Sequence, residues 1–171
     1  NRRQEAAVYE AIRDLGISEH VVYLDSRTGY KISEYYEGSH NARANHPEEI
    51  KACMAILRKL HGSGLTVNHS FDIRERIDFY ERLCMAGKGT LSVREKMERL
   101  MNRLEHLDRP KTLSHIDSNP DNFICLPDGS VRLIDWEYAG MCDPLIDISM
   151  CAIYVYYTEE QMNQLAELYL E

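Results

Sequence analysis

The sequence SHIDSNPDNF, residues 114–123, concentrates side chains that could take part in chemistry. It contains the imidazole of His115, the carboxylate of Asp117 two residues later and the amide of Asn122 five residues after that. A polar surface loop is the simplest interpretation of such a composition. The residues that follow favour a site instead, because they predict a scaffold that would hold these side chains together.

A β-hairpin is predicted directly after this stretch. Residues 123–135 run FICLPDGSVRLID, and an Asp-Gly pair between two apolar segments is among the strongest hairpin signals. A two-residue turn at Asp128-Gly129 would set Asn122 opposite Asp135, and opposed side chains lie about 4.5 to 5.5 Å apart. One small hard cation could then bind both. The same register would bury four apolar side chains: Ile124, Leu126, Val131 and Leu133.

An oxygen-rich corner beside a separate carboxylate suits phosphoryl transfer. In such a site Mg²⁺ bridges the phosphates, and the free carboxylate accepts the proton of the attacking hydroxyl. Asn122 and Asp135 would form the corner, and Asp117 would be the free carboxylate. Protein kinases use the same order of Asp, Asn and Asp. A metallohydrolase site with His115 and Asp117 is the alternative, although no third His or Cys has the spacing to complete it.

The ordered motifs resemble a known superfamily. The series His115-x-Asp117-x-x-x-x-Asn122 is followed by IDWEYAG at 134–140 and DPLID at 143–147. This series resembles the kinase-like small-molecule phosphotransferases. The resemblance implies a protein-kinase-like α+β fold.

Two longer stretches resemble one family within this superfamily. IDWEYAGMCDPLIDIS at 134–149 and FDIRERIDFYERL at 71–83 are most similar to the choline/ethanolamine kinase family, in particular to bacterial choline kinases. The resemblance extends over essentially the whole chain. It implies ATP and Mg²⁺ as cofactors and a small amino alcohol as the acceptor of the γ-phosphoryl group.

The resemblance also assigns roles to individual residues. Asp117 would be the catalytic base, and Asn122 and Asp135 would be the Mg²⁺ ligands. His115 would brace the loop, and Asp147 would support it from the next helix.

Three positions bear on how closely the family pattern is followed. The family usually has Asn or Gly after the His and a small or apolar residue after the Asp, whereas this chain has Ile116 and Ser118. These departures affect the fine geometry of the loop. Glu137 stands where protein kinases have the Gly of Asp-Phe-Gly, but this agrees with the choline kinase pattern.

Aromatic side chains near the motif are candidates for substrate binding. A ring can attract a quaternary ammonium with about 0.5 to 2 kcal/mol. Trp136, Tyr138 and Tyr154 are the nearest rings in sequence, with Glu137 between the first two. Core packing is the alternative for each ring, and Trp136 follows the metal-binding Asp where family members keep a buried aromatic residue.

The N-terminal segment NRRQEAAVYEAIRDLG predicts an amphipathic helix that ends at Gly16. Its apolar face comprises Val8, Ile12 and Leu15. By resemblance, Glu5 would pair with the phosphate-binding Lys of an earlier strand. That strand and its Gly-rich loop are missing, and the first residue is Asn1 rather than Met. We therefore expect a piece of a longer polypeptide that is inactive by itself.

A second hairpin is predicted from HVVYLD and GYKISEYYEG, which alternate about a turn at 26–29. By resemblance it ends the small lobe, and residues 34–38 form the hinge whose backbone meets adenine. Glu34, Tyr35 and Tyr36 would then bind the nucleotide. An ordinary hairpin with an aromatic edge is the alternative.

The remaining segments predict a mostly helical C-terminal lobe. Helices are expected at 47–61, 72–84, 92–107, 144–157 and 158–171. Capping boxes at Ser92 and Thr158 should begin the helices at 92–107 and 158–171, and the helix at 92–107 should bury one apolar stripe. The helix at 47–61 should bury another stripe: Ile50, Cys53, Met54, Leu57 and Leu60. Residues 1–37 would be a remnant of the N-terminal lobe and residues 38–171 a truncated catalytic lobe. AGKGT at 86–90 lacks the spacing of a phosphate-binding loop and should connect two helices.

Histidines outside the motif are assigned structural or surface roles. His61 would cap the C-terminus of its helix, where a cation is favoured by the helix dipole. The other histidines show no metal-ligand spacing and are expected at the surface: His20, His40, His46, His69 and His106.

Composition sets limits on partners. The chain has 171 residues, 20 Lys and Arg against 28 Asp and Glu, and a net charge of −8 without a basic cluster, so we expect no nucleic-acid partner. This balance would fit a cationic substrate. The apolar stretch 150–157 is too short to span a membrane. Five cysteines without a C-x-x-C pair indicate reduced thiols in a cytoplasmic protein. The oligomeric state is not indicated.

The sequence thus predicts a kinase that acts on choline or ethanolamine. A kinase for another small hydroxyl compound, such as thiamine, an aminoglycoside or a sugar, is one alternative. A catalytically inactive, kinase-like binding module is the other.

Overall fold

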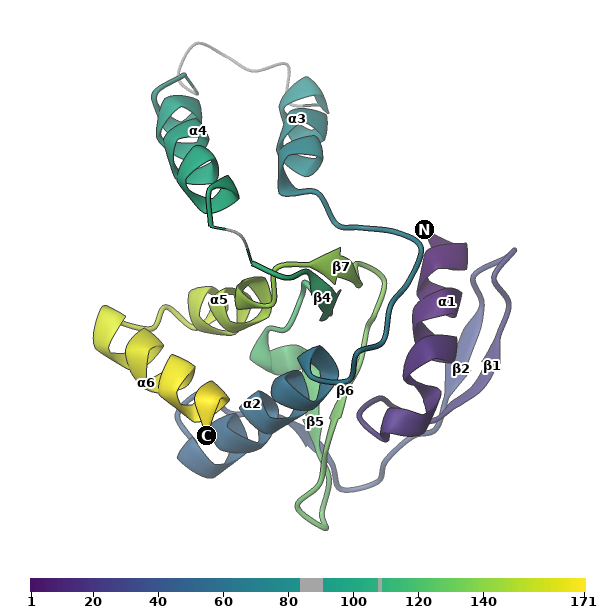
Figure 1. The fold of residues 1–171 in the computed structure, drawn as a ribbon. Helices are drawn as coiled ribbons and strands as arrows, with labels where there is room; N and C mark the ends of the chain where they lie inside the picture. Colours follow the sequence, from purple (N-terminus) through teal and green to yellow (C-terminus); the bar gives the residue numbers. More distant parts are fainter. Residues whose placement is uncertain (84–90, 108) are drawn as a thin grey trace. The chain divides into compact units, whose positions relative to one another are not determined.

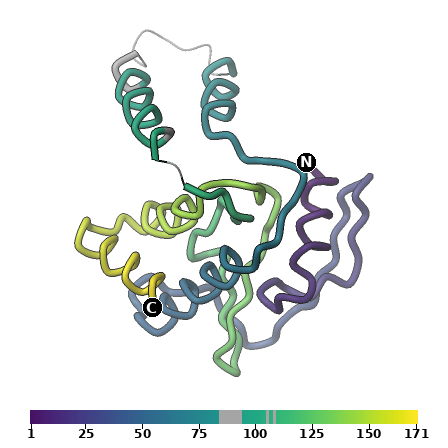
Figure 2. Tube along the Cα trace, in the orientation of Figure 1, coloured from purple at the N-terminus to yellow at the C-terminus, as the bar shows by residue number. Residues whose placement is uncertain are grey.

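The computed structural model describes residues 1–83, 91–107 and 109–171 (Figures 1 and 2). The chain forms two compact units. The larger unit comprises residues 1–71 and 111–171, and the helical insert comprises residues 72–110. Every predicted site residue therefore lies in the larger unit.

The N-terminal helix and hairpin form as predicted. Helix α1 (Arg2–Ile12) continues into the 3-10 turn η1 (Arg13–Leu15) and ends at Gly16, whose φ of 63° favours glycine. Strands β1 (Val21–Leu24) and β2 (Lys31–Ser33) pair in antiparallel fashion beside α1 (Figure 1). The turn between them closes with the Gly29 amide donating to the Asp25 carbonyl oxygen at 2.7 Å.

Helix α2 (Pro47–His61) lies where the sequence predicts it. Proline occupies the first helical position, and two glutamates lie in the first turn, at the positive end of the helix dipole. The helix packs against α6 (Glu159–Leu170). Its buried apolar residues match the predicted stripe: Ile50, Cys53, Met54, Leu57 and Leu60.

The predicted catalytic hairpin forms, but its predicted register is wrong by one residue. Strands β5 (Phe123–Cys125) and β6 (Val131–Leu133) pair Phe123 with Leu133 and Cys125 with Val131. The turn is longer than two residues, because the Leu126 amide bonds to the Ser130 carbonyl and the glycine between them has a φ of 82°. As a consequence Phe123 and Cys125 are buried, whereas Ile124 and Leu126 are only half-buried.

A third strand, β3 (His40–Asn41), joins the other side of β5, so that the sheet order is β3-β5-β6. Strands β4 (Thr112–Ser114) and β7 (Gly140–Cys142) form a separate pair. The 3-10 turn η2 (Pro120–Asn122) precedes β5. Helix α5 (Leu145–Tyr154) follows β7, and α6 begins with the predicted capping box at Thr158.

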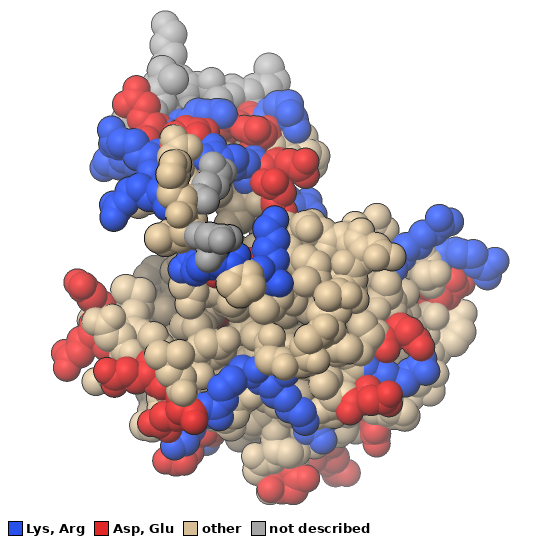
Figure 3. Space-filling model, viewed as in Figure 1, with Lys and Arg blue, Asp and Glu red and all other residues tan. Residues whose placement is uncertain are grey.

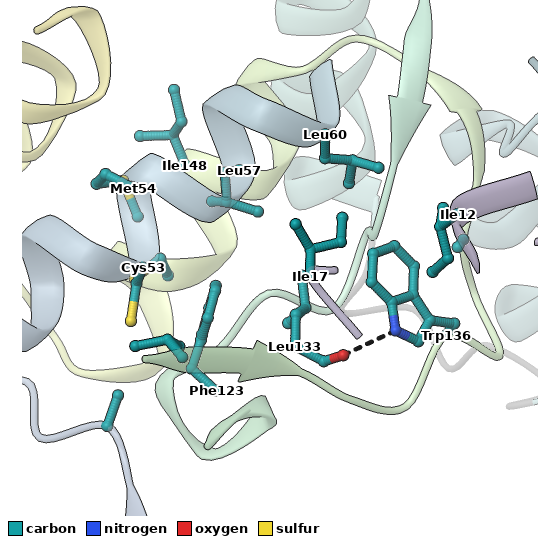
Figure 4. Close-up of a cluster of buried hydrophobic side chains, with 14 of the residues drawn as sticks. Ile12, Ile17, Cys53, Met54, Leu57, Leu60, Phe123, Leu133, Trp136 and Ile148 are labelled. Carbon is teal, nitrogen blue, oxygen red and sulfur yellow. Dashed lines mark hydrogen bonds between the residues drawn. The ribbon is translucent and has the colours of Figure 1, made fainter. Parts of the chain in front are cut away.

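One apolar core joins these elements. Figure 4 shows Met54, Leu57 and Leu60 of α2 packing toward Ile17 and toward the sheet. Phe123, Leu133 and Trp136 are fully buried in the same core, and the Trp136 indole donates to the Leu133 carbonyl oxygen at 2.8 Å. Truncation of one such side chain to Ala would cost about 2 to 5 kcal/mol of stability.

The helical insert contains α3 (Ile73–Leu83) and α4 (Leu91–Glu105). Arg94 pairs with Asp78 and Glu81, and Arg74 pairs with Glu98, so charged side chains link the two helices. The predicted burial of the α4 stripe is wrong for three leucines, because two helices cannot cover a whole apolar face. Leu100, Leu104 and Leu107 are 57%, 45% and 53% exposed.

Two sequence predictions in the insert fall outside the described residues. They are the AGKGT connection at 86–90 and the Ser92 side chain of the predicted capping box. In the space-filling view, basic and acidic side chains intermix across the face shown (Figure 3). Among the described helices, none combines the length and the apolar character needed to cross a membrane.

Candidate active site

The loop at 115–122 holds Asp117 in one orientation. Asp117 is half-buried. The Asn122 side-chain amide donates to Asp117 Oδ2 at 3.1 Å and to its carbonyl oxygen at 2.7 Å, and the Asn119 amide donates to Oδ1 at 3.1 Å. A carboxylate oxygen has lone pairs for more than one donor. Both oxygens of Asp117 are therefore fixed in position yet still able to accept a further hydrogen bond.

Local sequence explains how Asn122 reaches Asp117. Asn119 Oδ1 accepts a hydrogen bond from the Asp121 amide at 2.9 Å, and Pro120 opens the 3-10 turn η2. Asn and Pro favour this kind of turn, since Asn can bond to the backbone two residues on and Pro fixes φ. The turn brings Asn122 back beside Asp117, so the structure unites two of the predicted site residues.

Asp135 lies next to this pair at the end of β6. Ile134 lies opposite Asn122, in place of the predicted Asp135, and its amide donates to the Asn122 carbonyl oxygen at 2.9 Å. Asp135 follows directly in the chain. Asp135 is exposed and has a φ of 65°. Such a conformation costs a non-glycine residue about 1 to 3 kcal/mol, so the surrounding contacts must hold it.

The donor atoms at this corner fit a hard cation. The Asn122 amide nitrogen faces Asp117, which leaves its side-chain oxygen and the Asp135 carboxylate for a metal ion. Oxygen donors of this kind are the ligands that Mg²⁺ prefers.

A buried carboxylate braces the loop from inside. Asp147 of α5 is 0% exposed and accepts from the His115 amide at 2.8 Å and the Ile116 amide at 2.6 Å. Its carbonyl oxygen accepts the Ser118 hydroxyl at 2.6 Å. Ile116 adopts a φ of 77°, a strained value for a β-branched residue. Two consecutive amides that point at one carboxylate thus fix the shape of the loop.

A histidine completes this brace. His61 Nε2 lies 2.9 Å from Asp147 Oδ2, and His61 Nδ1 lies 2.8 Å from the Tyr169 hydroxyl. Burial by itself would raise the pKa of Asp147. The hydrogen bond and the charge of His61, together with the hydrogen bond from the His115 amide, outweigh burial and keep that pKa below its ordinary value. The predicted capping role of His61 is wrong, because its ring bonds to α5 and α6 rather than to the end of its own helix.

His115 is a buried, neutral member of the same loop. Its Nε2 lies 2.9 Å from the Ile134 carbonyl oxygen, and its ring meets the edge of Trp136 at 4.7 Å between centroids. Burial lowers the pKa of His115, although the Asp147 charge opposes the shift. His115 thereby ties the 115–122 loop to the residue before Asp135.

The segment at 34–38 connects the β1–β2 hairpin to the β3-β5-β6 sheet. The Glu34 amide donates to the His20 carbonyl oxygen, and the Tyr36 hydroxyl accepts from the His20 amide, both at 2.9 Å. Tyr35 is 86% exposed. The chain then enters β3, which pairs with β5, so this segment joins the hairpin to the sheet that carries Asn122. Glu34 and Tyr36 also line a cleft of about 710 Å³ beside α1 and β1.

Glu5 has a basic partner that the sequence analysis missed. Lys31 Nζ lies 3.6 Å from Glu5 and 3.1 Å from Glu19, and it donates to the Tyr9 hydroxyl at 2.6 Å. Burial and the charge of Glu19 raise the pKa of Tyr9. The prediction expected a lysine from an earlier strand, whereas Lys31 comes from β2, 26 residues later than Glu5. Only the fold brings these residues together.

The predicted substrate aromatics differ in accessibility. Trp136 is fully buried in the core, as in the alternative interpretation. Tyr138 and Tyr154 are 39% and 56% exposed, and Glu137 is exposed as well. Exposed rings can meet a ligand, so only the two tyrosines and Glu137 keep an open side.

Comparison with protein families decides the affiliation. A model described as "Phosphotransferase enzyme family" matches residues 1–170. The chain belongs to this phosphotransferase family. This family membership confirms the predicted resemblance to small-molecule phosphotransferases. Superposition on a solved choline kinase confirms the kinase-like fold.

Relatives of this phosphotransferase include a choline kinase named LicA, a second protein named LicA and a thiamine kinase. Choline kinase LicA from Streptococcus pneumoniae superimposes with a TM-score of 0.89 at 29% identity, covering 99% of this chain and 62% of that one, and LicA has also been solved with AMP. Protein LicA of Haemophilus influenzae is 25% identical over 99% of this chain and 66% of its own length. Thiamine kinase of Salmonella gallinarum is 29% identical over 94% and 56%. The chain thus spans roughly three fifths of these relatives.

Proposed function

We propose that this chain carries the catalytic centre of a kinase that transfers the γ-phosphoryl group of ATP to the hydroxyl of choline or ethanolamine. The observation that carries the proposal is the joint placement of Asp117, Asn122 and Asp135 at one end of the β5–β6 hairpin. The likeness to choline kinase LicA supports the acceptor class. Residues 1–37 would be a remnant of the N-terminal lobe, and residues 38–171 the catalytic lobe.

Asp117 acts as the base in this proposal. Its two oxygens are oriented by Asn119 and Asn122, so they can receive the acceptor hydroxyl without reorganisation. Asp117 would accept the hydroxyl proton while the oxygen attacks the γ-phosphorus in line with the leaving ADP oxygen. The bond between the acceptor oxygen and the γ-phosphorus forms as the bond between that phosphorus and the ADP oxygen breaks, and the hydroxyl proton passes to Asp117.

Asn122 and Asp135 would hold Mg²⁺. When bound there, Mg²⁺ would supply positive charge that offsets the negative charge of the phosphates during transfer. The protein's own contribution is to keep Asp135 in its left-handed conformation and Asn122 in its turn, through the Ile134 bond and the His115 contact. Asp147 and His115 are positioning residues, because they shape the loop without reaching the reacting atoms.

The nucleotide would lie against the segment at 34–38 and the half-buried face of β5. The existence of a LicA complex with AMP supports a nucleotide site in this fold. Glu34, Tyr35 and Tyr36 would contribute chiefly through their backbone. Glu5 would orient a phosphate-binding lysine, and Lys31 is its basic neighbour in this chain.

The acceptor would bind near the exposed residues that follow Asp135. Tyr138 and Tyr154 present accessible rings that can attract a cationic amine, and Glu137 adds a negative charge. Trp136 is excluded from direct contact by its burial. The overall charge of −8 favours a cationic acceptor over an anionic one.

A second candidate is phosphorylation of thiamine. The similarity to thiamine kinase over 94% of this chain favours it, and the same base and metal corner would serve both reactions. The two candidates differ only in which acceptor hydroxyl reaches Asp117.

The decisive experiment measures ADP release from Mg·ATP by the gene product that contains this chain. Choline, ethanolamine, thiamine, an aminoglycoside and no acceptor are tested in parallel. Turnover with choline or ethanolamine alone is expected. Turnover confined to thiamine would move the assignment to the second candidate, and nucleotide binding without any turnover would indicate a binding module.

Two variants test the role of the base in the same assay. Asp117→Asn should lower kcat by about 10² to 10⁴ while nucleotide affinity stays within about twofold. Asp121→Asn is the matched control, because it makes the same chemical change on an exposed residue of the same loop. Equal activity of the two variants would overturn the role of Asp117.

A further inference from the structure

A cluster of metal-ligating side chains lies on the opposite face of the β3-β5-β6 sheet from the half-buried Ile124. His40 of β3 and Cys125 of β5 are directly opposed partners in the sheet register. Glu49, in the first turn of α2, approaches both of them. One imidazole nitrogen, one carboxylate oxygen and the Cys125 sulfur all lie within 4.8 Å of one another.

The imidazole of His40 is already oriented as a ligand. Its Nδ1 lies 2.9 Å from the Asn41 carbonyl oxygen, and a nitrogen in that position carries the proton and donates. The lone pair is then on Nε2, which faces Glu49 Oε1 at 3.9 Å. A backbone carbonyl that fixes the tautomer in this way is a usual outer-shell partner of metal-binding histidines.

A second histidine borders the cluster. His46 occupies the N-cap of α2, yet its side chain makes no capping hydrogen bond there. Its Nδ1 instead lies 3.7 Å from Glu49 Oε1. The two histidines, Glu49 and Cys125 line one surface hollow of about 340 Å³.

We propose that His40, Glu49 and Cys125 bind a zinc-class divalent ion, with water in the fourth position. Tetrahedral zinc places nitrogen, oxygen and sulfur ligands about 2.0 to 2.3 Å from the ion, so neighbouring ligand atoms lie about 3.3 to 3.8 Å apart. His40 Nε2 and Glu49 Oε1 are 3.9 Å apart, and all three ligand atoms lie within 4.8 Å of one another, so small side-chain movements would close the site around the ion. The Cys125 thiol loses its proton to solvent when the ion binds, because the thiolate is the ligand.

The donor set separates this site from the Mg²⁺ corner proposed for catalysis. Thiolate and imidazole ligands select zinc and similar ions, whereas Mg²⁺ prefers oxygen donors alone. Arg43 pairs with Glu49 through Nε at 3.0 Å and also through Nη2. Its side chain is 55% exposed, so it can turn to solvent when an ion approaches Oε1. The Arg43 amide, at 2.7 Å from Oε2, would continue to orient the carboxylate.

A bound ion would link three segments that are distant in sequence. The first is β3, which follows residues 34–38, and the second is the start of α2. The third is β5, in which Cys125 lies three residues after Asn122. Binding to the folded state alone raises stability in proportion to the logarithm of ion concentration over the dissociation constant. The ion should therefore raise the melting temperature.

The test uses the gene product that contains this chain, freed of metal by a chelator. Zn²⁺ is titrated against a chromophoric chelator, and Co²⁺ is added separately to detect a thiolate charge-transfer band. One equivalent of Zn²⁺ should bind and raise the melting temperature, and Co²⁺ should produce the band. Failure of Zn²⁺ to bind the unmodified protein would overturn the proposal.

Matched variants assign the ligands. Cys125→Ser should remove the Co²⁺ band. His40→Gln should weaken Zn²⁺ binding at least about tenfold, because loss of even an outer-shell partner of a metal ligand costs about 10- to 100-fold in affinity. His20→Gln is the control, since His20 is an exposed histidine 3.4 Å from Glu34 and, in the described part of the chain, belongs to no group of metal-ligating side chains. Equal weakening by His20→Gln and His40→Gln, or a band that survives Cys125→Ser, would refute the site.

A last pair of variants separates the two metal sites and the cysteines. Asp135→Asn should leave the Co²⁺ band intact, because Asp135 belongs to the Mg²⁺ corner. Cys142→Ser should also leave it intact, since Cys142 is a buried thiol beside Phe71. Loss of the band in either variant would place the ion elsewhere and contradict the proposal.

Discussion

The loop at 115–122 presents two sides that differ in burial and bonding. On its inner side, Asp147 and His115 are 0% exposed and bond to the backbone. On its outer side, Asp117 and Asn122 are half-buried, and Asp135 is exposed. The Asp147 carboxylate and His115 Nε2 make their hydrogen bonds within the protein, and His115 Nδ1 is buried with no partner among the described residues. The outer oxygens retain capacity for a ligand.

This difference teaches how one short loop can be both rigid and reactive. The strained backbone at Ile116 and Asp135 is held by contacts on the inner side, through Asp147 and His115. The Asp117 carboxylate on the outer side is then oriented by two side-chain amides, those of Asn119 and Asn122. Mutations on the two sides should therefore separate activity from stability.

Replacement of the outer carboxylate should have the largest effect on activity alone. For Asp117→Asn we expect kcat to fall by about 10² to 10⁴, the usual contribution of a general base. The free energy of unfolding should change by no more than about 1 kcal/mol, since one amide hydrogen bond is altered. Steady-state kinetics and urea unfolding of the same preparation measure both. A large loss of stability would show that Asp117 belongs to the inner side.

Removal of the inner carboxylate should affect stability first. Asp147→Ala leaves His61 and two buried amides without their partner, and we expect a loss of about 3 to 5 kcal/mol. Activity should fall in parallel, because the loop loses its shape. Urea unfolding measures the change, with Asp14→Ala, an exposed residue of the turn η1, as the control. A variant as stable as the control would contradict the bracing role.

Substitution at the metal corner should give a smaller and more selective effect. Asp135→Asn should raise the Mg²⁺ concentration that gives half-maximal rate by about tenfold or more, because one charged oxygen ligand is lost. Its melting temperature without Mg²⁺ should match that of the unmodified protein. The comparison requires a Mg²⁺ titration at fixed ATP. An unchanged Mg²⁺ requirement would remove Asp135 from the proposed corner.

Acid should weaken the inner side in two stages. Burial lowers the pKa of His115, so the unfolded state takes up a proton first, and stability should decline as pH falls below about 6.5. The pKa of Asp147 is also lowered in the folded state. Its contribution is therefore complete above about pH 3.9 and is lost as pH falls through the lowered value.

Melting temperatures measured across this pH range test the order of the two stages. His115→Gln should remove the first stage and leave the second. His20→Gln, an exposed histidine, should retain both. Persistence of the first stage in His115→Gln would assign it to another group.

Sequence patterns predicted the helices and the two hairpins of the larger unit, because local signals determine them, but they did not predict the short strands β3, β4 and β7. The capping box at Thr158, the apolar stripe of α2 and the Asp-Gly turn each depend on neighbours in sequence. The motif of Asp117 and Asn122 could likewise be recognised from spacing alone. The hairpin register could not, since an Asp-Gly pair fits both a two-residue turn and the longer turn that forms.

Contacts between distant segments account for what the sequence missed. The partners of His61 lie 86 and 108 residues away, and those of Lys31 come from α1 and the loop before β1. No periodicity or spacing rule links such positions. In the helical insert, the apolar spacing of α4 could be recognised from the sequence. The sequence did not reveal that no third described element of the insert covers these apolar side chains.

The alternation of side chains along β6 sets a rule for changes in chain length. The turn at Asp128-Gly129 can take up a change of one residue, because hairpin turns of two and three residues both join antiparallel strands. Deletion of one residue within β6 would instead exchange the faces of the residues that follow it on that strand. Leu133 would turn away from the core, and Asp135 would shift away from Asn122. Changes in length should therefore be tolerated in the turn and not in the strand.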